Sequence, residues 1–194
     1  MSYAVKEIFY TLQGEGAHAG RPAVFLRFSG CNLWNGLEKD REKGSGGCAR
    51  WCDTNFFGTD GERGGRYEDA ATLARTARTL WPADSGRPYV VLTGGEPLLQ
   101  VDTALTTELH AVGFEIAVET NGTRELPEGI DWVCVSPKAG TNLVLTSGDE
   151  LKLVFPQEGF PPSDFQKLKF RHFFLQPMDG PNREQTVAQT IQYC

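Results

Sequence analysis

Short apolar runs recur along the chain, and each is followed by polar residues, often with glycine or proline among them. Continuous apolar runs of this length are typical of strands that are buried on both faces of a parallel sheet. Segments with apolar residues on one helical face lie between several of these runs. The pattern predicts strands at 5–12, 23–28, 89–92, 114–118, 132–135, 151–155 and 172–175, and helices at 67–80, 98–112 and 183–194.

This alternation of strands and helices predicts an α/β fold with a mostly parallel sheet. Because the strands are too few for a closed eight-stranded barrel, we expect a partial, open (β/α)6-type barrel with an abridged core. In such folds the functional site lies at the carboxyl ends of the strands. The stretches that begin at Thr93, Glu119, Ser136 and Gln176 each follow a predicted strand, so we expect them to share one rim. We expect residues 1–194 to form a single domain.

Composition excludes several classes of protein. Hydrophobic residues make up 40% of the chain and charged residues 23%, which is ordinary for a soluble globular protein. A formal net charge of −6 argues against a nucleic-acid partner. No apolar run approaches the length of a membrane span, and the polar start of the chain does not resemble an export signal. An odd number of cysteines, five, favours a reducing compartment, and we expect a cytoplasmic protein.

Three cysteines lie close together in the sequence, around a long polar loop. Cys31 follows the predicted strand 23–28, and Cys48 and Cys52 follow the loop, so that residues 32–51 form an inserted segment. Long loops without secondary structure are uncommon unless they have a function. Three thiolates around a metal centre would leave one coordination position open. The alternative is that these are unrelated thiols. Cys134 lies in an apolar strand and is expected to be an inert core thiol.

Several polar residues near the expected rim have two interpretations each. Gly95 and Glu96 either lie against a ligand, with the carboxylate as acceptor, or form a plain turn before a helix. Lys138 either meets a carboxylate or is solvated. Arg27, inside an apolar run, either points outward or meets an anion. Asp53 offers oxygen ligands of the kind that Mg²⁺ takes, as does the Thr54 that follows it.

The motifs together resemble the radical S-adenosylmethionine superfamily and, within it, the 7-carboxy-7-deazaguanine synthases of queuosine biosynthesis. They cover nearly the whole chain and occur in the order of the family. The matching stretches are F-Y-T-L-Q-G-E-G (9–16), R-F-S-G-C-N-L-W (27–34), C-D-T (52–54), T-G-G-E-P (93–97), E-T-N-G (119–122), S-P-K (136–138) and Q-P-M-D-G (176–180).

The resemblance implies a role for particular residues. A [4Fe-4S] cluster would be held by Cys31, Cys48 and Cys52, and Mg²⁺ by Thr54. S-adenosylmethionine would be bound by Trp51, Asp53, Gly95, Glu96, Ser136, Pro137, Lys138, Gln176, Pro177, Met178 and Asp179. The pterin substrate would be bound by Leu12, Gln13, Gly14, Glu15, Arg27 and Thr93, with Arg27 as a partner for its carboxylate.

The resemblance also implies a reaction. In the family, cleavage of S-adenosylmethionine yields a 5′-deoxyadenosyl radical, which abstracts a hydrogen from 6-carboxy-5,6,7,8-tetrahydropterin. The ring then contracts with loss of ammonia to give 7-carboxy-7-deazaguanine. The family further implies a homodimer and a flavodoxin-like electron donor.

The chain departs from the family pattern at three places. Three residues separate Cys48 from Cys52, where the family has two, and sixteen residues separate Cys31 from Cys48, where close relatives have fourteen. The chain also stops at Cys194, before the segment whose terminal carboxylate reaches the substrate in relatives. A second hypothesis therefore stays open. The chain would then be a non-catalytic binder of a pterin or nucleoside, with its cluster lost or replaced by zinc.

Overall fold

The computed structural model describes residues 2–84 and 86–194, and its strands form one eight-stranded sheet in the order β3-β1-β2-β4-β5-β6-β7-β8. The neighbouring strands β2, β4, β5, β6, β7 and β8 run parallel to one another. In contrast, β1 is antiparallel to both β2 and β3. The strands are β1 Tyr3–Leu12, β2 Pro22–Phe28, β3 Gly65–Tyr67, β4 Tyr89–Gly94, β5 Glu115–Thr120, β6 Trp132–Val135, β7 Ser147–Phe155 and β8 Lys169–Pro177. The prediction of an open (β/α)6-type barrel is confirmed, since the parallel part is built of β2 and β4 to β8 and the two edges do not meet.

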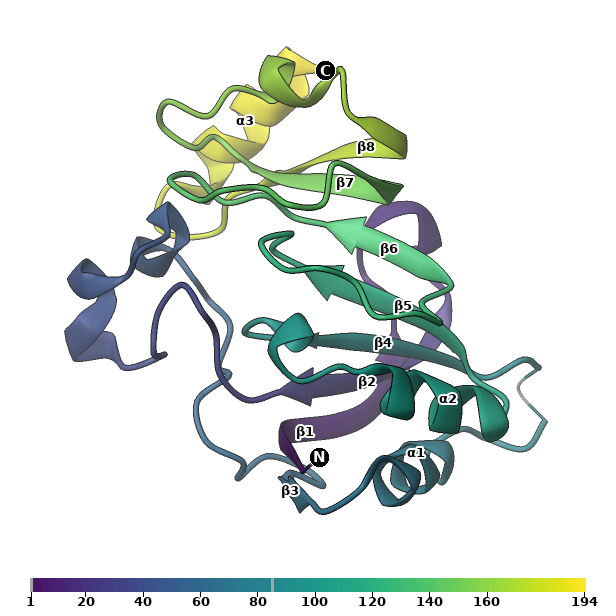
Figure 1. Cartoon of the computed structure of the whole chain (residues 1–194). Coiled ribbons are helices and arrows are strands. Elements are labelled where there is room, and N and C mark those ends of the chain that lie inside the picture. The colour runs from purple at the N-terminus through teal and green to yellow at the C-terminus, as the bar shows by residue number, and fades with distance from the viewer. Residues whose placement is uncertain (1, 85) are drawn as a thin grey trace.

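Helices cover only part of this sheet. They are α1 Ala70–Arg78, α2 Thr103–Ala111 and α3 Arg183–Tyr193, together with the 3-10 helices η1 Gly16–His18, η2 Glu38–Lys43, η3 Gly47–Arg50, η4 Pro97–Leu99 and η5 Pro162–Phe165. Figure 1 shows α1 and α2 side by side near the N-terminus, and α3 near β8 at the opposite end of the sheet. In the described residues no helix connects β5 to β6 or β6 to β7.

Two predicted helices begin later than expected because carboxylates cap their first turns. Asp69 accepts a hydrogen bond from Thr72 N (2.7 Å), so α1 begins at Ala70 and the residues up to Tyr67 form β3 instead. Asp102 accepts one from Leu105 N (3.0 Å), so α2 begins at Thr103 after the separate η4. Side chains at these positions satisfy backbone N–H groups that have no partner within the helix.

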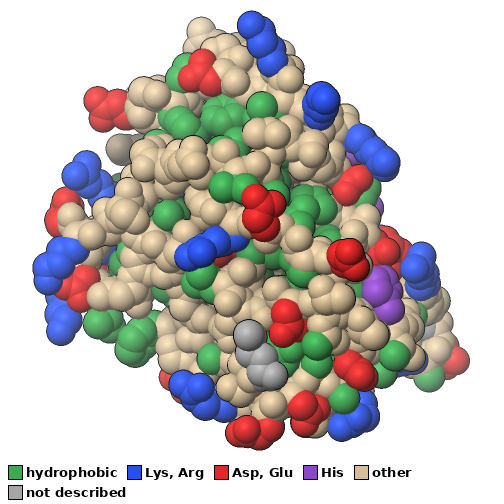
Figure 2. Space-filling model, in the orientation of Figure 1, with side chains coloured by type: hydrophobic (Ala, Val, Ile, Leu, Met, Phe, Trp, Pro, Cys, Tyr) green, Lys and Arg blue, Asp and Glu red, His purple; other side chains and the backbone are tan. Residues whose placement is uncertain are grey.

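The core lies between the sheet and the helices α1 and α2. Leu73 and Ala77 of α1 and Leu105 and Leu109 of α2 are fully buried against it. The parallel strands contribute continuous buried runs, such as Tyr89–Leu92 in β4, as expected of strands covered on both faces. On the face drawn in Figure 2, positive and negative side chains are interspersed.

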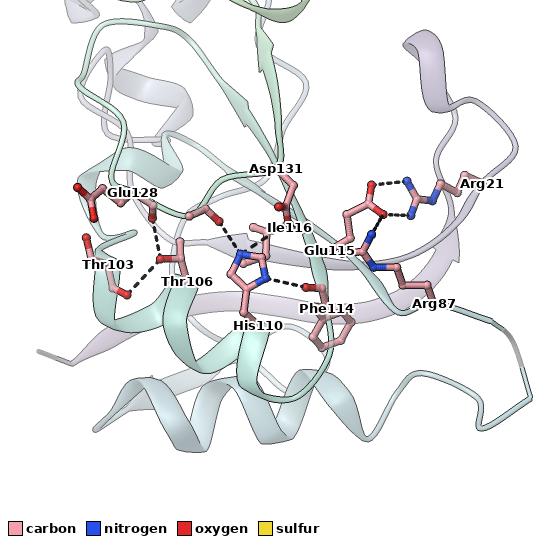
Figure 3. A network of polar contacts seen from close by, with 11 residues as sticks. Arg21, Arg87, Thr103, Thr106, His110, Phe114, Glu115, Ile116, Glu128 and Asp131 are labelled. Carbon is pink, nitrogen blue, oxygen red and sulfur yellow. Dashed lines mark hydrogen bonds and ion pairs between the residues drawn. The ribbon is translucent and has the colours of Figure 1, made fainter.

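A network of polar contacts lies at the amino ends of the parallel strands (Figure 3). The guanidinium of Arg21 donates to both carboxylate oxygens of Glu115 (2.9 and 2.8 Å), and Arg87 forms a second ion pair with it (3.3 Å). Nearby, the ring nitrogens of His110 lie 3.1 Å from Phe114 O and 3.0 Å from Gly129 O. These contacts connect α2, the start of β5 and the loop before β6.

Candidate active site at the strand ends

A cavity of about 470 Å³ opens at the carboxyl ends of the parallel strands. The stretches that follow or end β4, β5, β6 and β8 all contribute to its wall, through Thr93, Glu119, Ser136 and Gln176 among others. The prediction that these stretches share one rim is confirmed. Topology explains the convergence, because the carboxyl ends of parallel strands meet at one edge of a sheet.

The segment that carries Cys48 and Cys52 lies beside these strand ends (dark blue in Figure 1). It is not the plain loop that the sequence predicted, since it contains η2 and η3. The backbone of this segment forms hydrogen bonds with neighbouring parts of the chain at two places. Ser45 N donates to Leu33 O, just after Cys31, and Gly47 N donates to Ala139 O, just after Lys138 (both 2.8 Å).

Arg41 fixes the end of this segment. Its Nη1 donates to Ala49 O (2.8 Å) and to Cys52 O (3.0 Å), and its guanidinium lies 4.8 Å above the ring of Trp34. The planar guanidinium presents several donors in a fixed arrangement, which suits it to holding two carbonyl oxygens at once. Arg41 therefore sets the backbone on both sides of Trp51.

Cys48 and Cys52, which are separated by one residue more than in the family pattern, lie in a single helical turn. Cys52 N donates to Cys48 O at 2.7 Å, a hydrogen bond between residues four apart. In such a turn, residues at i and i+4 lie on the same side. The extra residue therefore does not direct the two thiols to opposite sides, and both contribute to the cavity wall.

The three thiols border the same cavity, and none of them forms a disulfide within the described residues. Cys48 is buried, and Cys31 and Cys52 are half-buried. Burial raises the pKa of the Cys31 thiol and raises that of Cys48 to about 11, although Lys138 acts on Cys48 in the opposite direction. Among the described residues, no three Cys, His, Asp or Glu side chains converge tightly enough to hold a single metal ion.

This donor set fits an iron–sulfur cluster better than a single ion. Clusters are held by cysteine thiolates, and all three thiols border a space larger than one ion needs. Metal binding takes the deprotonated sulfur, so it must displace the protons that burial favours on Cys31 and Cys48.

Most residues that the resemblance assigns to the cofactor lie on the cavity wall. Lys138 Nζ donates to Ser136 Oγ (2.5 Å) and lies 5.7 Å from the centre of the Trp51 ring. Burial lowers the pKa of Lys138. The wall includes Trp51, Asp53, Gly95, Ser136, Lys138, Gln176, Pro177 and Asp179.

Gly95 approaches another part of the chain so closely that no side chain fits there. A Cβ atom at this position would lie 2.8 Å from Cys31 Cβ and closer still to the backbone of Gly30. Glu96 N also donates to Gly30 O (3.0 Å). The glycine in this turn therefore allows β4 to approach the chain that delivers Cys31 to the cavity.

Three residues assigned to the cofactor do not line the cavity in this structure: Glu96, Pro137 and Met178. Glu96 is fully buried, and its carboxylate accepts hydrogen bonds from Leu98 N (2.9 Å), Thr120 Oγ1 (2.7 Å) and Asn121 N (2.8 Å). Burial raises its pKa, and these hydrogen bonds act in the opposite direction. Its carboxylate thus joins the turn after β4 to the end of β5. Met178 connects β7 and α3 through its backbone.

The residues assigned to the substrate all line the cavity: Leu12, Gln13, Gly14, Glu15, Arg27 and Thr93. Arg27 meets an anion, because its Nε donates to Glu7 Oε1 at 2.8 Å. The structure thereby decides between the two interpretations of a cation inside an apolar strand. Thr54, assigned to Mg²⁺, also lines the cavity, and its hydroxyl lies 3.4 Å from Asp53 Oδ1.

Lys152 also lines the cavity, although neither its position in the sequence nor the family motifs predicted a role for it. Its Nζ lies 2.6 Å from Glu15 Oε2 and 3.3 Å from Glu119 Oε1. The signal was present in the sequence, because Lys152 is an ionisable residue inside an apolar strand, as Arg27 is. Its partners were not visible, since Glu15 lies 137 positions away along the chain.

In the described part of the chain, no helix is long and apolar enough to cross a membrane. The structure and the cavity are those of an α/β protein with a cysteine-bordered site at the strand ends.

Comparison with known protein families defines the class. The family model for the radical SAM superfamily matches residues 45–150, more than half of the chain. The crystal structure of QueE from Escherichia coli covers the whole chain, with a TM-score of 0.69, 27% sequence identity and 90% of that structure aligned.

Curated relatives narrow the class further. A 7-carboxy-7-deazaguanine synthase from Bradyrhizobium diazoefficiens is 60% identical over 194 residues, and one from Burkholderia multivorans is 57% identical over 194 residues. Each match covers 100% of this chain and 91% of the relative. The chain belongs to the 7-carboxy-7-deazaguanine synthase family.

Proposed function

We propose that the chain converts 6-carboxy-5,6,7,8-tetrahydropterin to 7-carboxy-7-deazaguanine with loss of ammonia, as a radical S-adenosylmethionine lyase. The observation that carries the proposal is the cavity in which three free cysteines face the residues expected to bind cofactor and substrate. Family membership gives the reaction, and the cavity supplies a place for it.

The cofactors supply the radical chemistry, and the residues of the chain supply placement and electrostatics. When bound on Cys31, Cys48 and Cys52, a [4Fe-4S] cluster with S-adenosylmethionine provides the 5′-deoxyadenosyl radical. Lys138 offers a cation beside this position, and Ser136 fixes the direction of its ammonium. The aromatic ring of Trp51 lies on the same wall, 5.7 Å from the ammonium of Lys138.

On the substrate side, Arg27 places a guanidinium in the cavity for the carboxylate of the pterin. Its Nε is already held by Glu7, so the orientation of its remaining donors is fixed before substrate binds. Gln13 and Glu15 offer hydrogen-bonding groups for the ring, and Thr93 offers a hydroxyl.

We further propose that Thr54 takes part in a magnesium site that neutralises charge on the substrate carboxylate. Asp53 supports this by adding carboxylate oxygens at the same place. The assembly proposed from the family is a cytoplasmic homodimer reduced by a flavodoxin-like donor, and residues 1–194 act as one domain with 32–51 as the inserted cluster segment.

The first test is anaerobic reconstitution with iron and sulfide, followed by metal analysis and electron paramagnetic resonance of the reduced protein. We expect about four irons per chain and a signal that changes when S-adenosylmethionine is added. Incubation with the tetrahydropterin should then give 7-carboxy-7-deazaguanine by mass spectrometry.

Zinc in place of iron, or a signal that S-adenosylmethionine does not change, would instead favour the non-catalytic binder. A cluster that responds to the cofactor without any product would retain the radical class and reject this substrate. Turnover with and without Mg²⁺ in chelator-treated buffer tests the magnesium site separately.

A further inference from the structure

Lys152 is a buried cation on the cavity wall. In β7, Leu151 and Leu153 are buried in the core, whereas the alternate residues Lys152 and Val154 face the cavity. The Lys152 side chain is only 8% exposed. A lysine is seldom buried to this degree unless it is paired.

Two carboxylates from distant segments meet this ammonium. Glu15 comes from the connection between β1 and β2, and Glu119 comes from the end of β5. Glu119 Oε1 also accepts a hydrogen bond from Gln13 Nε2 (2.9 Å), so the group connects to a second residue of the β1–β2 connection. Lys152 thus joins three segments at one side of the cavity.

Each carboxylate retains an oxygen that accepts no hydrogen bond from the described part of the chain. Hydrogen bonds within residues 2–84 and 86–194 involve Oε2 of Glu15 and Oε1 of Glu119, but neither Oε1 of Glu15 nor Oε2 of Glu119. Both residues line the cavity, and ionised carboxylates are acceptors only. The cavity wall therefore offers acceptors for N–H groups of a ligand.

We propose that Lys152 is a positioning residue for the substrate: its ammonium holds Glu15 and Glu119 so that their unused oxygens accept N–H groups of the substrate ring. This inference rests on the proposed function, because a pterin carries an exocyclic amine and ring N–H groups on the edge away from its carboxylate. Arg27 would then bind the carboxylate, and the group around Lys152 the nitrogen-rich ring.

Electrostatics favour this role over simple stabilisation. Burial lowers the pKa of Lys152, but the attraction of Glu119 and Glu15 raises it more, so the group stays an ammonium. Buried ion pairs often add little net stability, because desolvation offsets their attraction. Two carboxylates and one ammonium leave one negative charge in excess, which suits a ring with N–H donors.

The test compares Lys152→Met and Lys152→Arg with the control Lys167→Met, which changes an exposed lysine. Each variant is reconstituted, and the measurements are KM and kcat for the tetrahydropterin, iron content, and the response of the electron paramagnetic resonance signal to S-adenosylmethionine. We expect Lys152→Met to raise KM roughly 10- to 100-fold, the range that losing one charge-assisted hydrogen bond gives. Iron content and the cofactor response should stay as in the wild type.

Lys152→Arg keeps the cation, so most of the rise in KM seen in Lys152→Met should be absent from this variant. Lys167→Met should behave as the wild type. An unchanged KM in Lys152→Met would overturn the proposal, as would a parallel loss of cluster, cofactor response and thermal stability. If Lys152→Met does not fold, Lys152→Gln takes its place, and failure of both to fold would make the residue structural and reject the proposal. Absence of product with the wild type would reject the proposed function instead.

Discussion

Two glutamates of strand β5 form ion pairs at opposite ends of the strand. They differ in how many of their carboxylate oxygens accept hydrogen bonds. At the amino end, both oxygens of Glu115 receive hydrogen bonds from Arg21 (Figure 3). At the carboxyl end, Glu119 Oε1 accepts hydrogen bonds from Lys152 and Gln13, whereas Oε2 accepts none from the residues that the structure describes. Their side chains are almost equally exposed, 20% and 22%.

Exposure therefore does not distinguish the carboxylate of Glu115 from that of Glu119, for which we propose a role in substrate binding. The two glutamates differ instead in the number of carboxylate oxygens that accept no hydrogen bond within the described residues, and in the cavity that lies beside Glu119. Removing a polar side chain or thiol at the carboxyl end should alter cluster or substrate binding with little loss of stability, and removing a polar side chain at the amino end should do the reverse.

The largest effect is expected for Cys52→Ala. Removing one of the three thiols leaves too few ligands for the cluster, so iron content after reconstitution and product formation should both fall to background. Thermal unfolding of the metal-free protein should change little, since Cys52 is half-buried at the cavity. The exposed Cys194 provides the matched control, and Cys194→Ala should retain iron and activity. Full iron content in Cys52→Ala would show that the cluster is held elsewhere.

A smaller but still large effect is expected for Gly95→Ala. The added methyl group would overlap the backbone of Gly30 and lie 2.8 Å from Cys31 Cβ, so the chain that delivers Cys31 must move. Iron content should fall at least about twofold, with a destabilisation of about 1–3 kcal/mol from overpacking. Gly14→Ala is the control, because a Cβ there meets nothing within 4 Å. Equal iron in the two variants would contradict the geometric account of Gly95.

A moderate effect on stability alone is expected for Arg21→Met at the amino end. Both partners are partly exposed, so the loss in unfolding free energy should be about 1 kcal/mol at pH 7, measured by urea denaturation. Turnover of the reconstituted variant should stay within about twofold of the wild type, since Arg21 does not line the cavity. A large loss of turnover with unchanged stability would contradict the comparison.

The same pair gives a pH dependence with a definite sign. Hydrogen bonds from Arg21 lower the pKa of Glu115 in the folded protein. The stabilisation is therefore present above the pKa of the unfolded carboxyl, about 4.3, and is lost as the pH falls through the lower folded value. The difference in unfolding free energy between wild type and Arg21→Met should shrink below about pH 4. A difference that stays constant to pH 3 would show that Arg21 acts by packing.

The smallest effect is expected for Arg50→Met. Arg50 forms an ion pair with Glu42 at 3.3 Å, but the side chains are 73% and 79% exposed. Exposed pairs contribute little, so the change in unfolding free energy should be below about 0.5 kcal/mol. Iron content should also be unchanged, because Arg41, not Arg50, holds the backbone of the cysteine segment. A measurable loss of iron would extend the functional region onto the surface.

Local pattern predicted the parallel sheet because each buried strand is a continuous apolar run, as at Tyr89–Leu92. It did not predict β3, since three residues of mixed polarity at Gly65–Tyr67 become a strand only by pairing with β1. It also began α2 too early, because the cap at Asp102 is a side-chain contact, reinforced by Tyr3 Oη at 2.7 Å.

The site was predictable where a motif marks a strand end and unpredictable where a partner comes from far along the chain. The cysteines and the stretches after the strands could be assigned to one rim from their order alone. The burial of Glu96 could not be predicted in this way, because it depends on hydrogen bonds that Thr120 and Asn121 donate to its carboxylate. The pairing of Lys152 with Glu15 is likewise set by the tertiary fold, which brings the β1–β2 connection beside β7, rather than by any local pattern.

The clamp that Arg41 forms on Ala49 and Cys52 has a consequence for how the protein acquires its metal. A flexible loop of this length loses conformational entropy when its ligands are gathered around a metal, and that loss opposes binding. Here the two carbonyls on either side of Trp51 are already fixed, and Cys48 and Cys52 already share one turn. Iron therefore arrives at a largely ordered segment, and maturation of the protein orders less chain than the length of the insertion suggests.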